Sequence, residues 1–312
     1  GATDRLGKVA DGNTVLDFDA EEKRRKSSVS SAMAAIEWDN TKLNIIDAPG
    51  LFDFENGSAE AVRAAEAVLI VTSAGSGVDV GTEKAFKAAE KRGLAKFFAI
   101  TKTDSDHRSF YKTFEALKEV YGNKLCPTII PYMEGNITKS YVNLMTGMAY
   151  EYDENGKATK VPMPNDPVIE EMTSAFMEAV ATTDDELMEK FFEGETFTPD
   201  EILKGLCTGI FDRPIYPVHA VAGLTGEGVD QLLYNLAWSV PGAYGYAGET
   251  AKNEAGEDVI LPCDINGPLA AVCFKTVADP FVGKMSFFKV VSGKLTPDTQ
   301  AYNVRTGETE KM

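Results

Sequence analysis

FFAITKTD, residues 97–104, joins an apolar run to a charged tetrapeptide, and LNIIDAPG, residues 43–50, does the same earlier in the chain. Each apolar run has the composition of a buried strand. Each is followed by a carboxylate, Asp104 or Asp47, where that strand would end. Open α/β sheets bind ligands outside the carboxyl ends of their parallel strands. The two stretches therefore predict a doubly wound, mainly parallel α/β sheet with a ligand site at one edge.

Strand and helix patterns alternate through the first part of the chain, with short connections between them. This alternation favours parallel strands joined by crossover helices. The helical pattern at 110–121, for example, repeats its apolar residues at helical spacing. The expected strands are 43–46, 67–72, 97–100 and 128–130, and the expected helices are 59–65, 82–92 and 110–121.

The rhythm changes near residue 132, where polar, turn-rich sequence is followed by three helical stretches. A strand–helix pattern resumes at 215–221, which indicates an insertion into the sheet domain. Short β-type runs separated by glycines follow residue 267 and predict the start of an all-β barrel. The expected domains are a sheet domain at 1–131 and 206–245, an inserted subdomain at 132–205, a linker at 246–261 and an incomplete barrel at 262–312.

The composition is that of an ordinary globular protein of 312 residues with a formal charge of −17. Such acidity opposes broad adhesion to nucleic acids or membranes, although docking on a large RNA machine through a local patch stays open. No run approaches the roughly 18 apolar residues of a spanning helix. The four cysteines lack zinc-site or redox-pair spacing. We therefore expect a cytoplasmic protein with reduced thiols and no membrane partner.

The segment Asp47-Ala48-Pro49-Gly50 offers the chemistry of a metal and phosphate site. A carboxylate at the end of a strand can hold Mg²⁺ directly or through water. Gly50 has no side chain to keep its backbone N–H away from a terminal phosphate. The alternative is an ordinary strand-ending turn, because Asp, Pro and Gly are common turn residues.

The tetrapeptide Thr101-Lys102-Thr103-Asp104 offers the chemistry of a guanine site. The Asp104 carboxylate can accept two parallel hydrogen bonds from guanine N1 and N2, a pair that adenine lacks. The stem of Lys102 can lie along the flat face of the base. The alternative is a solvated loop. Two strand–helix units separate the tetrapeptide from Asp47, and this order favours a guanine-nucleotide site.

With these motifs in this order, the chain resembles the translational GTPases, and among them elongation factor G and elongation factor G-like proteins. The resemblance implies GTP or GDP with Mg²⁺ as cofactors, and a GTPase-type sheet. It covers nearly the whole chain. The segments that carry it are 12–18 with 25–30, 47–50 with 52–54, 77–78 with 83, 101–104, 184–195, and 279–284 with 292–293.

The resemblance assigns further residues of the site. Ser28 corresponds to the switch-one threonine that binds magnesium together with Asp47. Thr101 stands where the family usually has asparagine, and Ala222-Gly223 aligns with the last base-contacting motif. Leu51 occupies the position of the histidine that orients the attacking water. Leu51 can neither donate nor accept a hydrogen bond, so the catalytic residue stays unassigned. The residue at this position argues against GTP hydrolysis by the family's usual route.

The phosphate loop of the family, of the type G-x-x-x-x-G-K-[ST], is absent from this sequence. The Gly-Lys pairs are not followed by Ser or Thr. The resemblance therefore implies a chain truncated at both ends, with the phosphate loop ahead of Gly1 and the later domains beyond Met312. Without the loop's amides and lysine, most of the phosphate binding energy is lost.

Three functions remain open. The first is the GTP-binding part of a GTPase that couples GTP hydrolysis to ribosomal translocation. The second is a guanine-nucleotide switch that binds the ribosome with little hydrolysis of its own. The third is a ribosome-protecting or otherwise specialised paralogue. All three imply guanine nucleotide and the ribosome, with its RNA and proteins, as partners, and we expect a monomer.

Residues 1–312 alone are expected to bind GDP and GTP very weakly or not at all, because no phosphate loop precedes the first switch. Isothermal titration calorimetry of this polypeptide with GDP, in the presence of Mg²⁺, measures the affinity directly. A micromolar dissociation constant would contradict the expectation.

Overall fold

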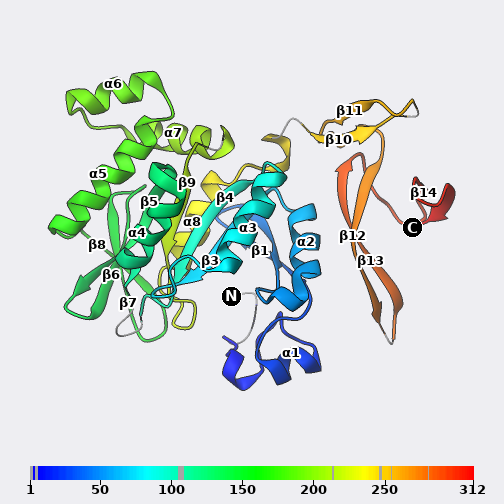
Figure 1. Cartoon of the computed structure of the whole chain (residues 1–312), viewed down its shortest axis with the longest axis horizontal. Coiled ribbons are helices and arrows are strands. Elements are labelled where there is room, and N and C mark those ends of the chain that lie inside the picture. Colours follow the sequence, from blue (N-terminus) through cyan, green and yellow to red (C-terminus); the bar gives the residue numbers. More distant parts are fainter. Residues whose placement is uncertain are drawn as a thin grey trace. The chain divides into compact units, whose positions relative to one another are not determined.

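The computed structural model describes residue 3 and residues 6–104, 109–212, 214–245, 248–253, 255–279 and 281–312. The chain forms two compact units, Gly1–Val240 and Pro241–Met312. Figure 1 shows both units with their helices and strands labelled. No helix in the described ranges has both the length and the apolar composition needed to cross a bilayer.

The first unit contains most of the regular structure. Its helices are α1 (Ala20–Arg25), α2 (Glu55–Ala64), α3 (Val80–Lys91), α4 (Phe110–Tyr121), α5 (Pro167–Ala181), α6 (Asp185–Glu193), α7 (Pro199–Asp212) and α8 (Val229–Ser239). Its strands are β1 (Ala32–Trp38), β2 (Thr41–Asp47), β3 (Ala67–Ser73), β4 (Ala95–Thr101), β5 (Leu125–Glu134), β6 (Ile137–Asn143), β7 (Met148–Tyr152), β8 (Ala158–Val161) and β9 (Tyr216–Ala220). Short 3-10 helices occupy Val9–Asp11, Phe52–Phe54 and Gly122–Lys124.

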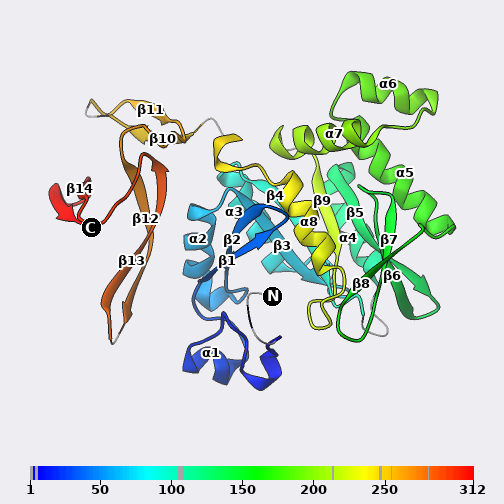
Figure 2. The ribbon, with the colours of Figure 1, turned by 180° about the vertical axis from the view of Figure 1, so that it is seen from behind.

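A seven-stranded sheet in the order β3-β4-β9-β5-β6-β7-β8 forms the centre of this unit. The first four of these strands run parallel, and β6, β7 and β8 continue the sheet antiparallel. Helices α3 and α4 cover one face, and α8 lies on the other (Figures 1 and 2). This arrangement confirms the predicted doubly wound α/β fold.

Strand β4 is buried because helices cover both faces of the sheet. Phe97, Phe98 and Ile100 are all 0% exposed. The ring of Phe98 packs against Phe86 of α3 and Tyr121 of α4, with centroid distances of 6.3 and 5.2 Å. A strand buried on both faces needs a nearly continuous apolar run, as FFAI supplies. The core therefore fixes the carboxyl end of β4, where the guanine tetrapeptide begins.

The range 132–205, predicted as an inserted subdomain, extends the same sheet. The first part of β5 pairs in parallel with β9, and its second part pairs antiparallel with β6. Helix α5 packs against β5, and α6 and α7 pack against α5. The turn between β7 and β8 contains Gly156 at a φ of 72°, at the predicted Asn155-Gly156 hairpin signal. The backbone of β6 is therefore hydrogen-bonded into the same sheet as β5 and β9, which fixes where its side chains lie.

Strand β2 corrects the expectation that residues 43–46 form a buried parallel strand. Among the described residues, β2 pairs only with β1, antiparallel, in a separate two-stranded sheet. The turn at Asp39-Asn40 has φ values of 45° and 59°, the geometry of a tight hairpin. Ile45 is 39% exposed. The alternating pattern of β2 reflects a hairpin with one open face, and Asp47 still follows its last apolar residues.

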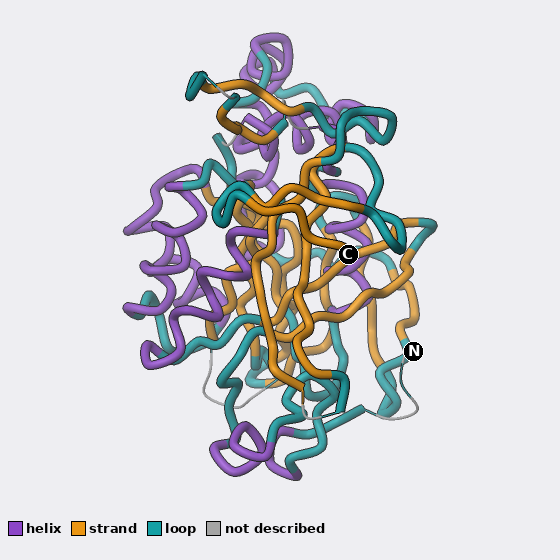
Figure 3. The backbone as a smooth tube through the Cα atoms, turned by 90° about the vertical axis from the view of Figure 1, so that its right-hand side faces the viewer, coloured by secondary structure: helices purple, strands orange, loops and turns teal. Residues whose placement is uncertain are grey.

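The second unit consists of a short 3-10 helix at Ala243–Gly245 followed by hairpins. β10 (Glu249–Lys252) pairs with β11 (Asp258–Leu261), β12 (Ala270–Asp279) with β13 (Gly283–Ser292), and β14 (Gln300–Asn303) with β15 (Glu308–Lys311). The long β12–β13 hairpin is visible in Figure 3. The first hairpin lies in the range expected to be a linker, where Asn253 Oδ1 accepts from the backbone N–H groups of Ala255 and Glu257. Residues 246, 247, 254 and 280 lie outside the described residues.

His219 in β9 is fully buried, and its environment disfavours a charge. Nδ1–H donates to the carbonyl oxygen of Phe98 at 3.2 Å, because that oxygen can only accept. Nε2 is buried without a hydrogen-bond partner. Burial lowers the pKa of His219 to about 4, from the ordinary value of 6.5. The folded protein therefore contains the neutral imidazole at neutral pH.

We expect the free energy of unfolding to fall as the pH drops from 6.5 to 4. In this window the unfolded chain takes up a proton at His219 that the folded chain does not, which removes roughly 3 kcal/mol in total. Urea denaturation at several pH values measures the effect. His219→Gln keeps a donor for Phe98 and does not titrate, so its stability should depend less on pH. Parallel losses in both proteins would contradict the expectation.

Candidate functional site

The guanine tetrapeptide, 101–104, leaves the carboxyl end of β4 in a defined turn. The hydroxyl of Thr101 donates to the carbonyl oxygen of Thr72 on β3 at 3.3 Å. Lys102 has a φ of 60°, a left-handed conformation that costs a non-glycine residue about 1 kcal/mol. The side chains of Lys102 and Asp104 are exposed. The turn thus presents a cation and a carboxylate at the edge of the sheet.

The loop that follows β9 lies beside this turn. β4 and β9 pair in parallel with Ile100 opposite Ala220, so their carboxyl ends coincide. The hydroxyl of Thr103, which is buried, donates to the carbonyl oxygen of Val221 at 3.1 Å. The structure therefore brings together the two segments that the sequence assigned to the guanine base.

Ala222 and Gly223 begin a tight turn that ends at Glu227. The N–H of Ala222 donates to the carbonyl oxygen of Glu227 at 2.9 Å. The Ala222 side chain is fully buried. A Cβ on Gly223 would meet nothing within 4 Å, and its φ lies outside the left-handed region. Neither packing nor backbone conformation requires glycine there, and the open space leaves the backbone of Gly223 accessible to a ligand.

Gly50 has the same property on the metal side of the candidate site. A Cβ at this position would meet nothing within 4 Å, and its φ is not left-handed. The preceding residue is held firmly, since Ser58 Oγ donates to the carbonyl oxygen of Pro49 at 2.8 Å. Gly57 of α2 packs beneath Pro49, where a Cβ would lie 2.8 Å from the ring Cδ. The segment 47–50 is therefore clamped by α2, while Gly50 faces open space.

Asp17, to which the sequence alone assigned no role in the site, lies near both predicted metal ligands. Ser28 Oγ donates to Asp17 Oδ1 at 2.7 Å. Burial raises the pKa of Asp47, and the charges of Asp17 and Glu22 raise it further. Asp17 is thus the common neighbour of Ser28 and Asp47. No local signal distinguished it from the other acidic residues of the segment.

This donor set fits Mg²⁺. Mg²⁺ prefers hard oxygen ligands, keeps several waters, and usually binds through one or two carboxylates plus substrate phosphate oxygens. Ser28 uses its proton toward Asp17, which leaves its oxygen lone pairs available for a cation. A divalent cation would also offset the repulsion that raises the pKa of Asp47. Within the described ranges no three His, Cys, Asp or Glu residues cluster as metal ligands.

Leu51 lies directly after the metal-side segment and is 49% exposed. It precedes the short helix Phe52–Phe54, in which Phe52 lies under Lys84 Nζ at 4.5 Å from the ring centroid. Lys84 also pairs with Glu55 Oε2 at 3.3 Å. These contacts hold the turn around Leu51, and the side chain of residue 51 itself offers no group that could orient a water molecule.

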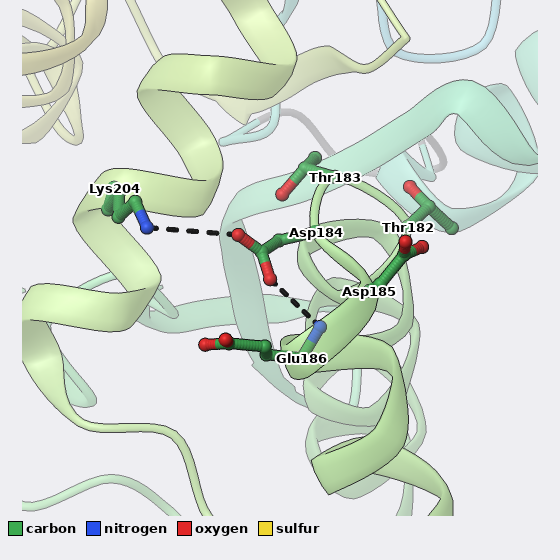
Figure 4. A pocket seen from close by; sticks show the side chains of 6 residues that line it. All are labelled: Thr182, Thr183, Asp184, Asp185, Glu186 and Lys204. Carbon is green, nitrogen blue, oxygen red and sulfur yellow. Dashed lines mark hydrogen bonds and ion pairs between the residues drawn. The ribbon is translucent and has the colours of Figure 1, made fainter.

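No described hydrogen bond or ion pair joins the metal-side residues Ser28, Asp47 and Gly50 to the guanine-side residues. The structure therefore forms two half-sites on this unit. A separate surface hollow lies at the start of α6 (Figure 4), where Asp184 accepts from the N–H of Glu186 at 2.9 Å and pairs with Lys204 at 3.7 Å. No predicted site residue lines this hollow.

Comparison with known proteins places these half-sites in context. The family model described as the elongation factor Tu GTP-binding domain matches residues 1–241. The chain is 31% identical over 302 residues to the elongation factor G-like protein of Mycobacterium tuberculosis, in strains CDC 1551 / Oshkosh and ATCC 25618 / H37Rv. That match covers 96% of this chain and 42% of the relative. The chain thus spans less than half the length of these relatives.

A solved structure is similar over the whole chain. It is a crystal structure of a protein from Thermus thermophilus, with a TM-score of 0.83 and 28% sequence identity. The match covers 100% of this chain and 44% of that one. The likeness therefore includes both compact units and the inserted strands.

Gly57→Ala is expected to lower the free energy of unfolding by about 1–2 kcal/mol. The new methyl group would overlap Pro49 and lie 3.2 Å from the backbone nitrogen of Ser31, and such overpacking outweighs the gain in helix propensity. Gly50→Ala is the matched control, because its methyl group meets open space and should change stability by less than about 0.5 kcal/mol. Urea denaturation of both variants measures the difference. Equal stabilities would show that the clamp on Pro49 is not tight.

Proposed function

The chain belongs to the translational GTPases, as an elongation factor G-like member with the elongation factor Tu GTP-binding domain, and from that premise we propose that its full-length protein couples GTP hydrolysis to translocation on the ribosome. Its partners would be guanine nucleotide and the RNA and proteins of the ribosome. That activity would belong to a monomer in the cytoplasm.

One observation carries the proposal on the nucleotide side. The turn 101–104 and the turn 222–227 lie side by side at the carboxyl edge of β4 and β9, joined by the hydrogen bond from Thr103 to Val221. Asp104 is exposed at this edge, so its carboxylate is free to accept from guanine N1 and N2. The N–H of Gly223 can approach the guanine carbonyl oxygen because no side chain intervenes. Adenine would leave Asp104 without a matching donor pair.

The metal-side residues support the phosphate chemistry. Ser28 and Asp47 would hold Mg²⁺, with Asp17 orienting Ser28, and the bound ion supplies charge neutralisation at the terminal phosphate. Gly50 has open space beside it, where its N–H could meet a γ-phosphate oxygen. Phosphate contacts of this kind order switch segments and release them when the phosphate is lost. The candidate switches are 12–18 with 25–30, and 47–50 with 52–54.

Leu51 favours a second candidate function. A residue that orients the attacking water must donate or accept a hydrogen bond, and leucine does neither. The turn around it is held by Lys84, Phe52 and Glu55, and the Leu51 side chain is partly exposed. A guanine-nucleotide switch that binds the ribosome, including a ribosome-protecting paralogue, would need no hydrolysis of its own.

Ribosome-stimulated phosphate release by the full-length protein tests the proposal. We expect release from GTP in the presence of ribosomes. We also expect Asp104→Asn to lose GTP activity and to gain activity with XTP, because the asparagine amide can donate to the C2 carbonyl of xanthine. The exchange of base preference in a single variant assigns the activity to this site rather than to a contaminant.

The outcomes separate the two functions. GTP-dependent ribosome binding without phosphate release would support the switch and overturn the hydrolytic proposal. Leu51→His should then restore some hydrolysis if the remaining residues are correctly placed. Absence of guanine-nucleotide binding by the full-length protein would overturn both candidates.

A further inference from the structure

Tyr141 of β6 reaches from the inserted range into the guanine half-site. Its side chain is 1% exposed. Its hydroxyl lies 2.8 Å from Thr103 Oγ1, within hydrogen-bond distance. Thr103 stands between Lys102 and Asp104, and its own side chain is buried beneath that turn. A side chain of β6 therefore supports the guanine turn from below.

A second residue of β6 holds the same turn. The hydroxyl of Thr138 donates to the carbonyl oxygen of Thr103 at 2.8 Å. Thr103 is thus held at its hydroxyl by Tyr141 and at its carbonyl by Thr138. The two contacts restrain both the side chain and the backbone of the residue that precedes Asp104. They are made by a strand that the ladder of β5 keeps in register.

The same tyrosine also contacts the second guanine turn. Because Thr103 gives its own proton to Val221, the Tyr141 hydroxyl donates to Thr103 Oγ1, and Glu227 Oε2 at 3.3 Å is a second, more distant acceptor of the same proton. The backbone of Glu227 closes the turn that begins at Ala222. Burial raises the pKa of Glu227, and the charge of Asp104 raises it further, so the carboxyl group lies close enough to sense the guanine turn. One hydroxyl therefore touches both segments that face the base.

The ring of Tyr141 has little freedom to move. A Cβ on Gly228 would lie 3.1 Å from Tyr141 Cδ1, which shows how closely the ring packs on that backbone. On another side, the ring meets Tyr152 edge to face, with centroids 5.7 Å apart. A rigid ring delivers its hydroxyl to a fixed point, which is what a positioning residue requires.

We propose that Tyr141 is a positioning residue for guanine recognition, whose hydroxyl sets the turn 101–104 against the turn 222–227 and so aims the Asp104 carboxylate at the base. The proposal rests on the proposed guanine-nucleotide function. It assigns to the inserted range a direct part in base selectivity, through Thr103 and Glu227. It also predicts that the effect is felt at the base and not at the phosphates.

Tyr141→Phe in the full-length protein tests the proposal, with GDP and inosine diphosphate (IDP) as probes. Inosine lacks the N2 amino group, so it engages only one oxygen of Asp104. Loss of one net hydrogen bond from the support should weaken GDP binding roughly fivefold. It should weaken IDP binding less, so that the preference for GDP over IDP narrows. A change in packing alone would weaken both ligands equally.

Tyr152→Phe is the matched control. Tyr152 lies on the neighbouring strand β7, and its hydroxyl donates to Asp230 at the start of α8 in a partly buried hydrogen bond. The variant removes the same atom from the same range, but it does not touch Thr103. Both affinities should therefore stay at the level of the unaltered protein. Thermal unfolding of both variants separates any general loss of stability from the effect on the ligand.

Thr103 supplies an independent test of the same contact. Thr103→Val removes the hydroxyl and should narrow the preference for GDP over IDP, as Tyr141→Phe does. Thr103→Ser keeps the hydroxyl and should retain the preference of the unaltered protein. The double variant Tyr141→Phe/Thr103→Val should lose less than the sum of the two single losses, because both single variants remove the Tyr141–Thr103 contact, while each also removes one of its own, to Glu227 or to Val221.

The outcomes are distinguishable. In one outcome the unaltered protein prefers GDP, and Tyr141→Phe has the same affinities for GDP and IDP as Tyr152→Phe. This result overturns the inference and leaves the guanine function intact. Equal weakening of GDP and IDP in Tyr141→Phe also overturns it. An unaltered protein that binds neither probe overturns the function and the inference together.

Discussion

The parallel pairing of β4 with β9 is the constraint on which the candidate guanine site depends. Both strands are buried by helices on the two faces of the sheet, and their registers align Ile100 with Ala220. The segments that leave these strands must therefore emerge side by side. A polar turn at such a point is held by a rigid core, although its own residues contribute little to that core. The exposed carboxylate of Asp104 and the open backbone of Gly223 are both consequences of this alignment.

The sequence contained enough information for the parts of the fold that depend on local pattern. Runs such as FFAI at 97–100 predict their strands because only a strand covered on both faces needs four apolar residues in succession. The pairing of β2 was not predictable in this way. Its apolar residues suit a buried strand or a hairpin equally, and the turn at Asp39-Asn40 that decides between them lacks the glycine that usually marks a tight hairpin.

The residues of the candidate site also fall into those that local sequence predicts and those that only distant contacts reveal. Asp47, Gly50 and the residues 101–104 carry their chemistry in contiguous segments, so they could be assigned from the sequence, and the assignments remain predictions. Asp17 and Tyr141 act through contacts made at a distance along the chain. A tyrosine on an inserted strand has the same sequence signature whether its hydroxyl packs in the core or meets Thr103. Only the register of β6 against β5 shows which of these it does.

The left-handed backbone of Lys102 places opposing demands on one residue. Glycine would adopt that conformation without steric strain, but it would remove the stem that can lie along the base. The folded chain therefore retains a strained backbone at Lys102, where stability alone would favour glycine or asparagine. Directed evolution of this protein for heat resistance, without selection for nucleotide use, would drift toward those residues at position 102. A single substitution at residue 102 would then raise thermostability and weaken base recognition.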